Sequence, residues 1–209
     1  MPIDRPPDDT GSLSPTLMSA LAVPAPLWRR LIASIYDGLL LVGLWMVTLL
    51  LSLPLNKLLG LAPGNMLTRA MLFLVGLGFF AWFWTRGGQT LGMRAWRLQV
   101  RREQGELLRL PIAAVRYTAM MIWWGVVLTP AAVRMIDRVP RLAELVPNAD
   151  IVGAVAVIVV AMALIAQRLD GRRRLPHDWI AGSEVVRLPD NPFPAEKKRR
   201  NARLPKNQG

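Results

Sequence analysis

Four long runs of uncharged, mostly apolar residues dominate the 209-residue chain and limit the folds open to it. Hydrophobic side chains make up 53% of the sequence, more than ordinary soluble domains contain. A helix rises about 1.5 Å per residue, so about 20 residues cross the hydrocarbon core of a bilayer. The pattern predicts an all-α membrane protein, a bundle of four transmembrane helices. The expected spans are residues 31–53, 67–85, 111–133 and 149–167.

Prolines and polar residues set the expected ends of the membrane domain. Pro54 should end the first span, because the residue before a proline disfavours the helical conformation. Residues 1–26 are polar and rich in proline, which indicates a disordered cytoplasmic tail. Residues 189–209 are rich in Pro, Lys and Arg, which indicates a second, basic disordered tail. The four-span domain should therefore occupy residues 27–188.

The 26 Lys and Arg residues are unevenly distributed, and their distribution predicts the orientation. Three precede the first span, six lie between the second and third, and eleven follow the fourth, against five in the two other loops. Cytoplasmic loops of membrane proteins carry the excess of basic residues. We therefore expect a multi-pass protein of the bacterial inner (plasma) membrane with both termini and the middle loop in the cytoplasm.

The middle loop, residues 86–110, has a pattern typical of strands. Apolar and polar side chains alternate over residues 96–101, which is the period of a half-buried strand. Residues 103–106 form a plausible turn, and residues 107–110 could return as a partner strand. Residues 184–188, after the fourth span, are a further strand candidate. We expect a small cytoplasmic β element that links the middle loop to this last segment.

Asp37 is the residue whose position most needs an explanation. It lies at the entrance of the first span, seven residues after Arg30, and sixteen uncharged residues follow it. A charged side chain inside a membrane helix costs about 2.5–3.5 kcal/mol on insertion scales, so such residues are usually paired. Arg30 shares the face of Asp37 but lies roughly 10 Å away along the helix. Arg116, at a similar depth in the third span, is the expected partner of Asp37.

Three motifs, taken in order, resemble a known family. Arg30 and Asp37 open the first span, and the segment 88–94 (Gly-Gln-Thr-Leu-Gly-Met-Arg) follows the second. His177-Asp178 follows the fourth span. Over about residues 26–190, this arrangement resembles the RDD family of small multi-span membrane proteins, which is named for one arginine and two aspartates.

The resemblance implies roles for individual residues. Arg30 corresponds to the family arginine, Asp37 to its first aspartate and Asp178 to its second. The family often has lysine after the second glycine of the middle motif, whereas this chain has Met93 followed by Arg94. The motif residues that would support the charges are Gly88, Gly92, Arg94 and His177.

The sequence leaves two interpretations of Asp178 open. Pro176 can start a short helix over residues 177–181, since proline is favoured at the first helical position. The carboxylate of Asp178 then either reaches Arg30 or interacts with the N-terminal turn of its own helix. We expect His177 to be a satisfied interfacial histidine rather than a proton shuttle. The candidate functional charge cluster is Arg30, Asp37, Arg116 and Asp178.

Two functions compete at this stage. The resemblance implies transport of ions or small ligands, with cation/proton exchange suggested for some members. Asp37 would then be the titrating carboxylate. We expect a homo-oligomer in that case, because four spans leave little room for alternating access in a monomer. The alternative is a non-transport scaffold or assembly factor whose buried charges are structural. A hydrated cavity around the charges would favour transport, and a dry cluster would favour a scaffold.

Other classes of function find little support in the sequence. There is no Cys and only one His, which argues against a metal site with these ligands. No Ser/His/Asp arrangement is apparent, so we expect neither an enzyme nor a cofactor. The net charge of +12 is concentrated beside the apolar runs. The expected partners are therefore the lipid bilayer and its anionic lipids, and not nucleic acid.

Overall fold

The computed structural model describes residues 22–136 and 148–189. Pro24–Arg187 forms one compact unit, and the remaining residues, Met1–Val23 and Leu188–Gly209, are assigned to a second. The tails that we predicted to be disordered therefore lie almost entirely outside the described residues. The exception is residues 22–26, which are considered with the sheet below.

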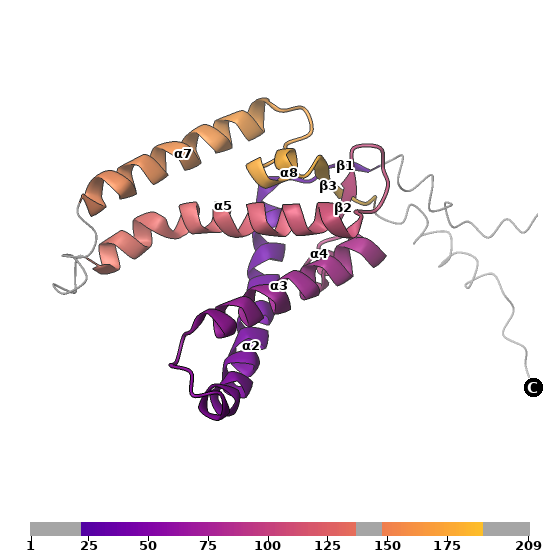
Figure 1. Cartoon of the computed structure of the whole chain (residues 1–209). Helices are drawn as coiled ribbons and strands as arrows, with labels where there is room; N and C mark the ends of the chain where they lie inside the picture. Colours follow the sequence, from indigo (N-terminus) through magenta and orange to yellow (C-terminus); the bar gives the residue numbers. More distant parts are fainter. Residues whose placement is uncertain (1–21, 137–147, 190–209) are drawn as a thin grey trace, which may run out of the picture. The chain divides into compact units, whose positions relative to one another are not determined.

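Four long helices make up most of the compact unit (Figure 1). They are α2 (Leu27–Leu58), α3 (Met66–Arg86), α5 (Leu110–Ile136) and α7 (Ala149–Leu169). All four are long and apolar enough to cross a membrane, which confirms the predicted fold class. Each extends beyond the span that we expected, α7 at its C-terminal end and the other three at both ends.

Pro54 does not end the first helix, which continues through it to Leu58. Proline lacks the N–H that would bond the carbonyl four residues earlier, and this normally weakens a helix. Membrane helices tolerate the loss where neighbouring groups support the turn. The Asn56 side chain, just beyond the proline, donates to the Thr68 hydroxyl of α3 at 3.0 Å. Our expectation was wrong because this contact with the next helix holds the last turn of α2.

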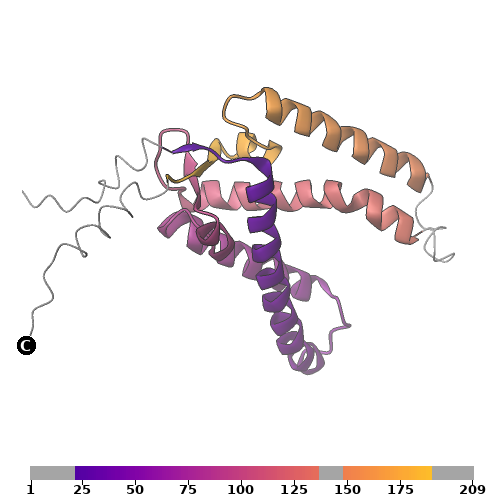
Figure 2. The same cartoon turned by 180° about the vertical axis from the view of Figure 1, so that it is seen from behind.

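The helices pack in sequence order along the chain. Helix α2 packs against α3, α3 against α5, and α5 against α7. Figures 1 and 2 show α5 and α7 running side by side. Gly153 of α7 faces Val133 of α5 at one point of this contact. Most other side chains of α7 remain exposed, as expected for a helix surrounded by lipid.

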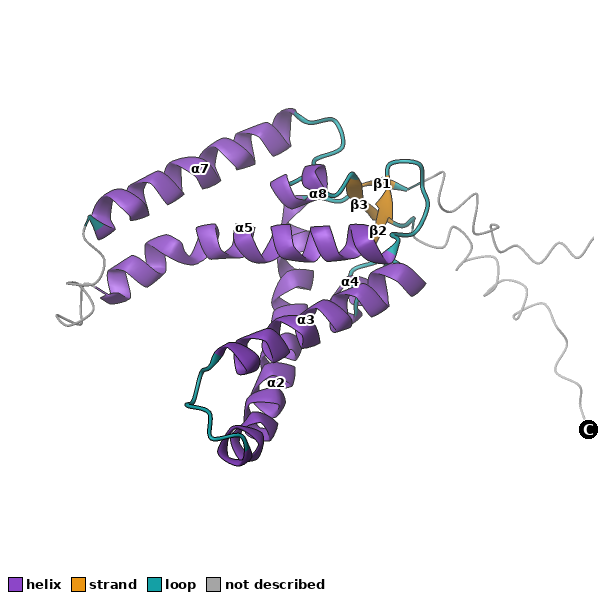
Figure 3. Cartoon of the chain, viewed as in Figure 1, coloured by secondary structure: helices purple, strands orange, loops and turns teal. Residues whose placement is uncertain are grey.

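A three-stranded sheet joins the middle loop to the segment after α7 (Figure 3). Strands β1 (Val23–Pro24), β2 (Leu98–Arg102) and β3 (Ser183–Arg187) lie in the order β1-β3-β2. β2 and β3 are antiparallel. The predicted β element between these two segments is confirmed. The end of the bundle that carries the sheet is called the sheet end below.

Two details of the sheet differ from our predictions. The return strand expected at residues 107–110 is wrong: only Leu108 of these four is buried, and Leu110 already begins α5. A strand with one inward side chain has little to hold it, whereas β3 offers β2 a buried face. The tail expected to run to residue 26 is also too long, because the Ala25 N–H donates to the Val185 carbonyl at 3.0 Å.

The hydrophobic core lies at the sheet end. Phe80 of α3 packs against Trp84 and against Tyr117 of α5, with ring centroids 5.0 and 5.7 Å apart. Leu98 and Val100 of β2 are fully buried and belong to the same cluster. The sheet is therefore packed against the ends of the membrane helices, and this packing positions the charged residues.

Candidate functional site: a buried triad and a separate latch

Asp178 is positioned by a short helix, α8 (Pro176–Ile180), which follows α7. Proline at the start of a helix loses no hydrogen bond, because the first N–H groups have no partner within the helix. Asp178 is the third helical residue, and its carboxylate accepts from the Leu175 N–H at 2.9 Å. This contact is the half of a capping box that the third helical residue supplies, and the Asp178 N–H donates to the Leu175 backbone carbonyl at 2.8 Å. The predicted short helix exists, shifted by one residue toward the N-terminus.

Two arginines from different membrane helices converge on Asp178. Arg30 of α2 donates to Oδ2 of Asp178 and, at 2.7 Å, to the Arg173 carbonyl. Arg116 of α5 donates to Oδ1 of Asp178 at 2.5 Å and also to the Ser183 hydroxyl of β3. We call Arg30, Asp178 and Arg116 the buried triad. Together with Ser183, the triad joins α2, α5, α8 and β3. Both interpretations of Asp178 hold, because its carboxylate accepts from Arg30 and also from the Leu175 N–H at the start of its own helix.

The triad is closed to solvent. The side chain of Asp178 is 0% exposed, that of Arg116 2% and that of Arg30 7%. Burial raises the pKa of Asp178, but the guanidinium groups of Arg30 and Arg116 outweigh burial and hold that pKa well below its ordinary value. The carboxylate is therefore charged, and two positive charges surround one negative charge.

His177 lies beside the triad but does not complete it. Its Nε2 is 3.6 Å from Oδ1 of Asp178. Burial lowers the pKa of His177 to about 3, and both arginines lower it further while Asp178 raises it. The imidazole is therefore neutral at physiological pH. Its Nδ1 has no hydrogen-bond partner among the described residues, so our expectation of a satisfied histidine is wrong for that atom.

Trp84 shields the triad from the core of the bundle. The Arg116 guanidinium lies over its ring, 5.1 Å from the centroid. A cation above an aromatic face is stabilised by the ring's quadrupole, by about 2 kcal/mol or more where water is excluded. Trp84 is 1% exposed. Trp84 is thus part of the wall of the charge cluster.

Asp37 does not belong to the triad, and its expected pairing with Arg116 is wrong. Its Oδ2 accepts from the Thr90 hydroxyl, and its Oδ1 accepts from the Gly92 N–H at 2.9 Å. Both donors are at the start of the short helix α4 (Leu91–Ala95), where N–H groups are free and negative charge is favoured. Arg116 is engaged by Asp178 instead. We call Asp37, Thr90 and Gly92 the latch.

The glycines of the middle motif are explained by close contacts. A Cβ on Gly92 would overlap the Ala33 carbonyl of α2 and lie 3.0 Å from Oδ1 of Asp37. Gly88 has φ +67°, a conformation that residues with a side chain rarely adopt, and its carbonyl accepts from the Val100 N–H at 2.7 Å. Arg94 is exposed and lies outside the triad and the latch. Of the supporting motif, Gly92 thus belongs to the latch, and Gly88 connects the end of α3 to β2.

Two members of these networks escaped sequence analysis. Thr90 caps α4, since its hydroxyl accepts from the Met93 N–H at 3.3 Å. Threonine just before a short helix is a recognised capping signal, so Thr90 was open to prediction. Ser183 gave no such signal, because only the pairing of β3 with β2 brings it to Arg116.

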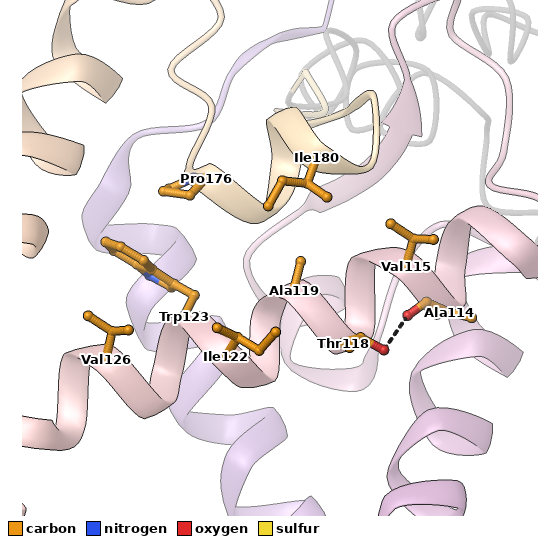
Figure 4. A pocket seen from close by; sticks show the side chains of 9 residues that line it. All are labelled: Ala114, Val115, Thr118, Ala119, Ile122, Trp123, Val126, Pro176 and Ile180. Carbon is orange, nitrogen blue, oxygen red and sulfur yellow. Dashed lines mark hydrogen bonds between the residues drawn. The ribbon is translucent and has the colours of Figure 1, made fainter.

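The charges do not line the cavity between α5 and α8. A cavity of ≈ 490 Å³ lies between α5 and α8 (Figure 4), and no triad or latch residue lines it. We call it the α5/α8 groove. Its lining residues are Ala114, Val115, Thr118, Ala119, Ile122, Trp123, Val126, Pro176 and Ile180. Within residues 22–136 and 148–189, no three His, Asp or Glu side chains are close enough to hold a metal ion.

The comparisons with known proteins agree with the arrangement of the motifs. Residues 24–182 match the model of the RDD family, and this segment contains the whole triad and the whole latch. No curated protein and no solved structure matches the chain. The family match and the four apolar helices together identify the chain as a multi-pass membrane protein that belongs to the RDD family.

Proposed function

We propose that this protein is a non-enzymatic membrane scaffold, in which the buried charges hold the sheet end in one arrangement and do not carry ions. The observation that supports the proposal is that both carboxylates are fully engaged by the chain itself. Asp178 accepts from two guanidinium groups and an amide. Asp37 accepts from a hydroxyl and an amide. A carrier needs a carboxylate that exchanges such partners for an ion or a proton.

Energetics favour a fixed arrangement of the triad. Removing one partner from a buried ion pair costs about 3–5 kcal/mol, because the other charge is left without compensation. Release of Asp178 during a transport cycle would leave two guanidinium groups, Arg30 and Arg116, buried without their carboxylate. A free-energy cost of that size in every transport cycle favours a triad that stays closed.

The proposed scaffold faces the cytoplasm of a bacterial inner membrane with its sheet end. The uneven distribution of Lys and Arg supports this orientation, since the middle loop and the segment after α7 carry most of them. Exposed arginines at this end would meet the anionic lipids of the inner leaflet. Among them are Arg94, Arg109, Arg168 and Arg172.

The surface that we assign to a protein partner is the turn at residues 103–106. Glu103 pairs with Arg172 at 2.9 Å and also with Arg174, so the turn is fixed to the segment that links α7 to α8. Arg174 is in turn held by Asp170 at 3.0 Å. A preorganised surface loses less conformational freedom on binding than a flexible loop does. Gln104, at the tip of the turn, is exposed.

Site-specific photo-crosslinking in cells tests the scaffold. A photoreactive amino acid at Gln104 should give one protein adduct of fixed mass, and the same amino acid at the exposed Ala62 of the opposite loop should not. The adduct at Gln104 should persist in Asp37→Asn, because the partner surface does not depend on a charge at residue 37. Absence of any protein adduct at Gln104 in otherwise folded protein would contradict the proposal.

A second candidate function is cation/proton exchange at Asp37. The observation that favours it is the buried polar face of α2 beyond Asp37, which contains Thr48, Ser52 and Asn56. However, the hydroxyls of Thr48 and Ser52 donate to carbonyls of their own helix at 2.8 and 2.7 Å. These groups are therefore satisfied locally, which favours the scaffold. Ion-coupled flux that is lost in Asp37→Asn would instead support exchange.

A further inference from the structure

The α5/α8 groove is lined mostly by apolar side chains, and these have no role in the proposed scaffold. Pro176 and Ile180 of α8 face Ala119 and Trp123 of α5 across it (Figure 4). Thr118 carries the only hydroxyl among the lining residues, and that hydroxyl donates to the Ala114 carbonyl at 3.0 Å. Apart from the indole N–H of Trp123, the lining therefore offers no free hydrogen-bonding side chain. An occupant must be apolar over most of its length.

The groove runs along α5, a helix that is long and apolar enough to cross a membrane. Its lining begins at Ala114, four residues after the start of α5, and reaches Val126. Twelve residues of helix are about 18 Å long, which is close to the roughly 15 Å of hydrocarbon in one leaflet. Ile122 and Ile180 are each 65% exposed at its sides. The groove is therefore open to the bilayer and runs along one leaflet.

The size of the groove argues against a helix as its occupant. A helix is about 10 Å across, so a length of about 18 Å would fill roughly 1,400 Å³. The groove holds ≈ 490 Å³. This volume lies within the range of about 300–1,000 Å³ that is usual for small-molecule sites. A single hydrocarbon chain matches the length, the width and the chemistry of the groove.

We propose that the α5/α8 groove holds one acyl chain of a membrane phospholipid. The chain packs along α5 beneath α8, and Pro176 and Ile180 close the groove from above. Because Asp178 lies between these two residues in α8, the bound chain also supports the helix that carries the triad. This site does not depend on whether the protein acts as a scaffold or as an exchanger.

Lipid retention measures the proposed site directly. The full-length protein is extracted in mild detergent, washed, and examined by native mass spectrometry for bound phospholipid. Thr118→Trp and Ile122→Trp each place an indole in the groove from an exposed position. Ala131→Trp, exposed on the same helix outside the groove, is the matched control. We expect one retained phospholipid in the wild type and in Ala131→Trp, and about tenfold weaker retention in the two filled variants, or about 1.4 kcal/mol.

Photo-crosslinking locates the chain. In vesicles that contain phosphatidylcholine with a diazirine on its acyl chain, adducts should concentrate on residues 114–126 and 176–180. Equal retention in the wild type and both filled variants would overturn the proposal, as would adducts spread evenly over the four helices. A photoreactive amino acid at residue 118 that cross-links two copies of the protein would overturn the proposal as well, because a second copy would then occupy the groove. Thermal unfolding of each variant confirms that it is folded.

Discussion

The two buried carboxylates of this protein are held by different chemistry. Asp178 is surrounded by two full positive charges and an amide. Asp37 is held by a hydroxyl and an amide, and it forms no ion pair within the described part of the chain. A neutral acceptor of the same shape can replace a carboxylate that meets neutral donors. It cannot replace one that balances buried charge. The two aspartates for which the family is named therefore differ in how much their negative charge contributes to the stability of the fold.

Asp178→Asn should have the largest effect on stability. It leaves Arg30 and Arg116 buried without a counter-charge, so the free energy of unfolding in detergent should fall by about 3–5 kcal/mol. Asp170→Asn is the matched control, because Asp170 also pairs with an arginine but is 15% exposed. This pair is part-buried and lies nearer to solvent than the triad, and Asp170 faces one guanidinium group instead of two, so Asp170→Asn should cost less than Asp178→Asn. Similar losses in the two variants would contradict the role of the triad.

Acidification should destabilise the protein through His177. Its pKa is about 3 in the folded chain against an ordinary value of 6.5, so between these values the unfolded chain binds one more proton. Stability is therefore complete above pH 6.5 and falls as the pH drops toward 3, by roughly 1.4 kcal/mol per pH unit for one proton. Chemical unfolding at pH 7, 6 and 5 measures this slope.

His177→Gln should remove most of that slope, since glutamine does not titrate. The low pKa of Asp170, about 2, does not interfere, because its contribution is lost only below the ordinary value of 3.8. A slope that is unchanged in His177→Gln would show that another group titrates in this range.

Asp37→Asn should lower the free energy of unfolding by less than either Asp178→Asn or acidification does. The amide oxygen of asparagine can still accept from the Gly92 N–H, and the loss should be about 1 kcal/mol, typical of one hydrogen bond. Asp37→Leu removes every acceptor from the buried Thr90 hydroxyl and the Gly92 amide, so it should cost about 1–3 kcal/mol for each. Equal effects of Asp37→Asn and Asp178→Asn would erase the distinction between latch and triad.

The sequence was sufficient to predict the spans and the short helix, which depend on apolar length and on a proline. It left the approach of Arg30 to Asp178 as one of two open interpretations. The partner of Asp37 was missed because depth in the membrane gives the height of a side chain and not the neighbour that it meets. The free amides of α4 decide that neighbour, and they exist only once the chain after α3 has folded against α2.

Strand pairing shows the same limit. The alternation in residues 96–101 predicted a strand and its link to residues 184–188, more than 80 residues later, and the pairing of β2 with β3 confirms both. The additional partner strand predicted at residues 107–110 is not formed. Local pattern describes a strand's own faces, whereas pairing depends on which other strand offers a buried face. Ser183 became a partner of Arg116 through that pairing, so it had no signal in the sequence.

Ion-coupled flux across proteoliposomes tests the central claim most directly. The full-length protein is reconstituted with a pH-sensitive dye inside the vesicles, and Na⁺ or K⁺ gradients are imposed in the presence and absence of a pH gradient. We predict that the wild type shows no flux above protein-free vesicles and that folded Asp37→Asn is indistinguishable from it. Flux in the wild type that disappears in folded Asp37→Asn would contradict the account, because Asp37 would then carry an ion or a proton.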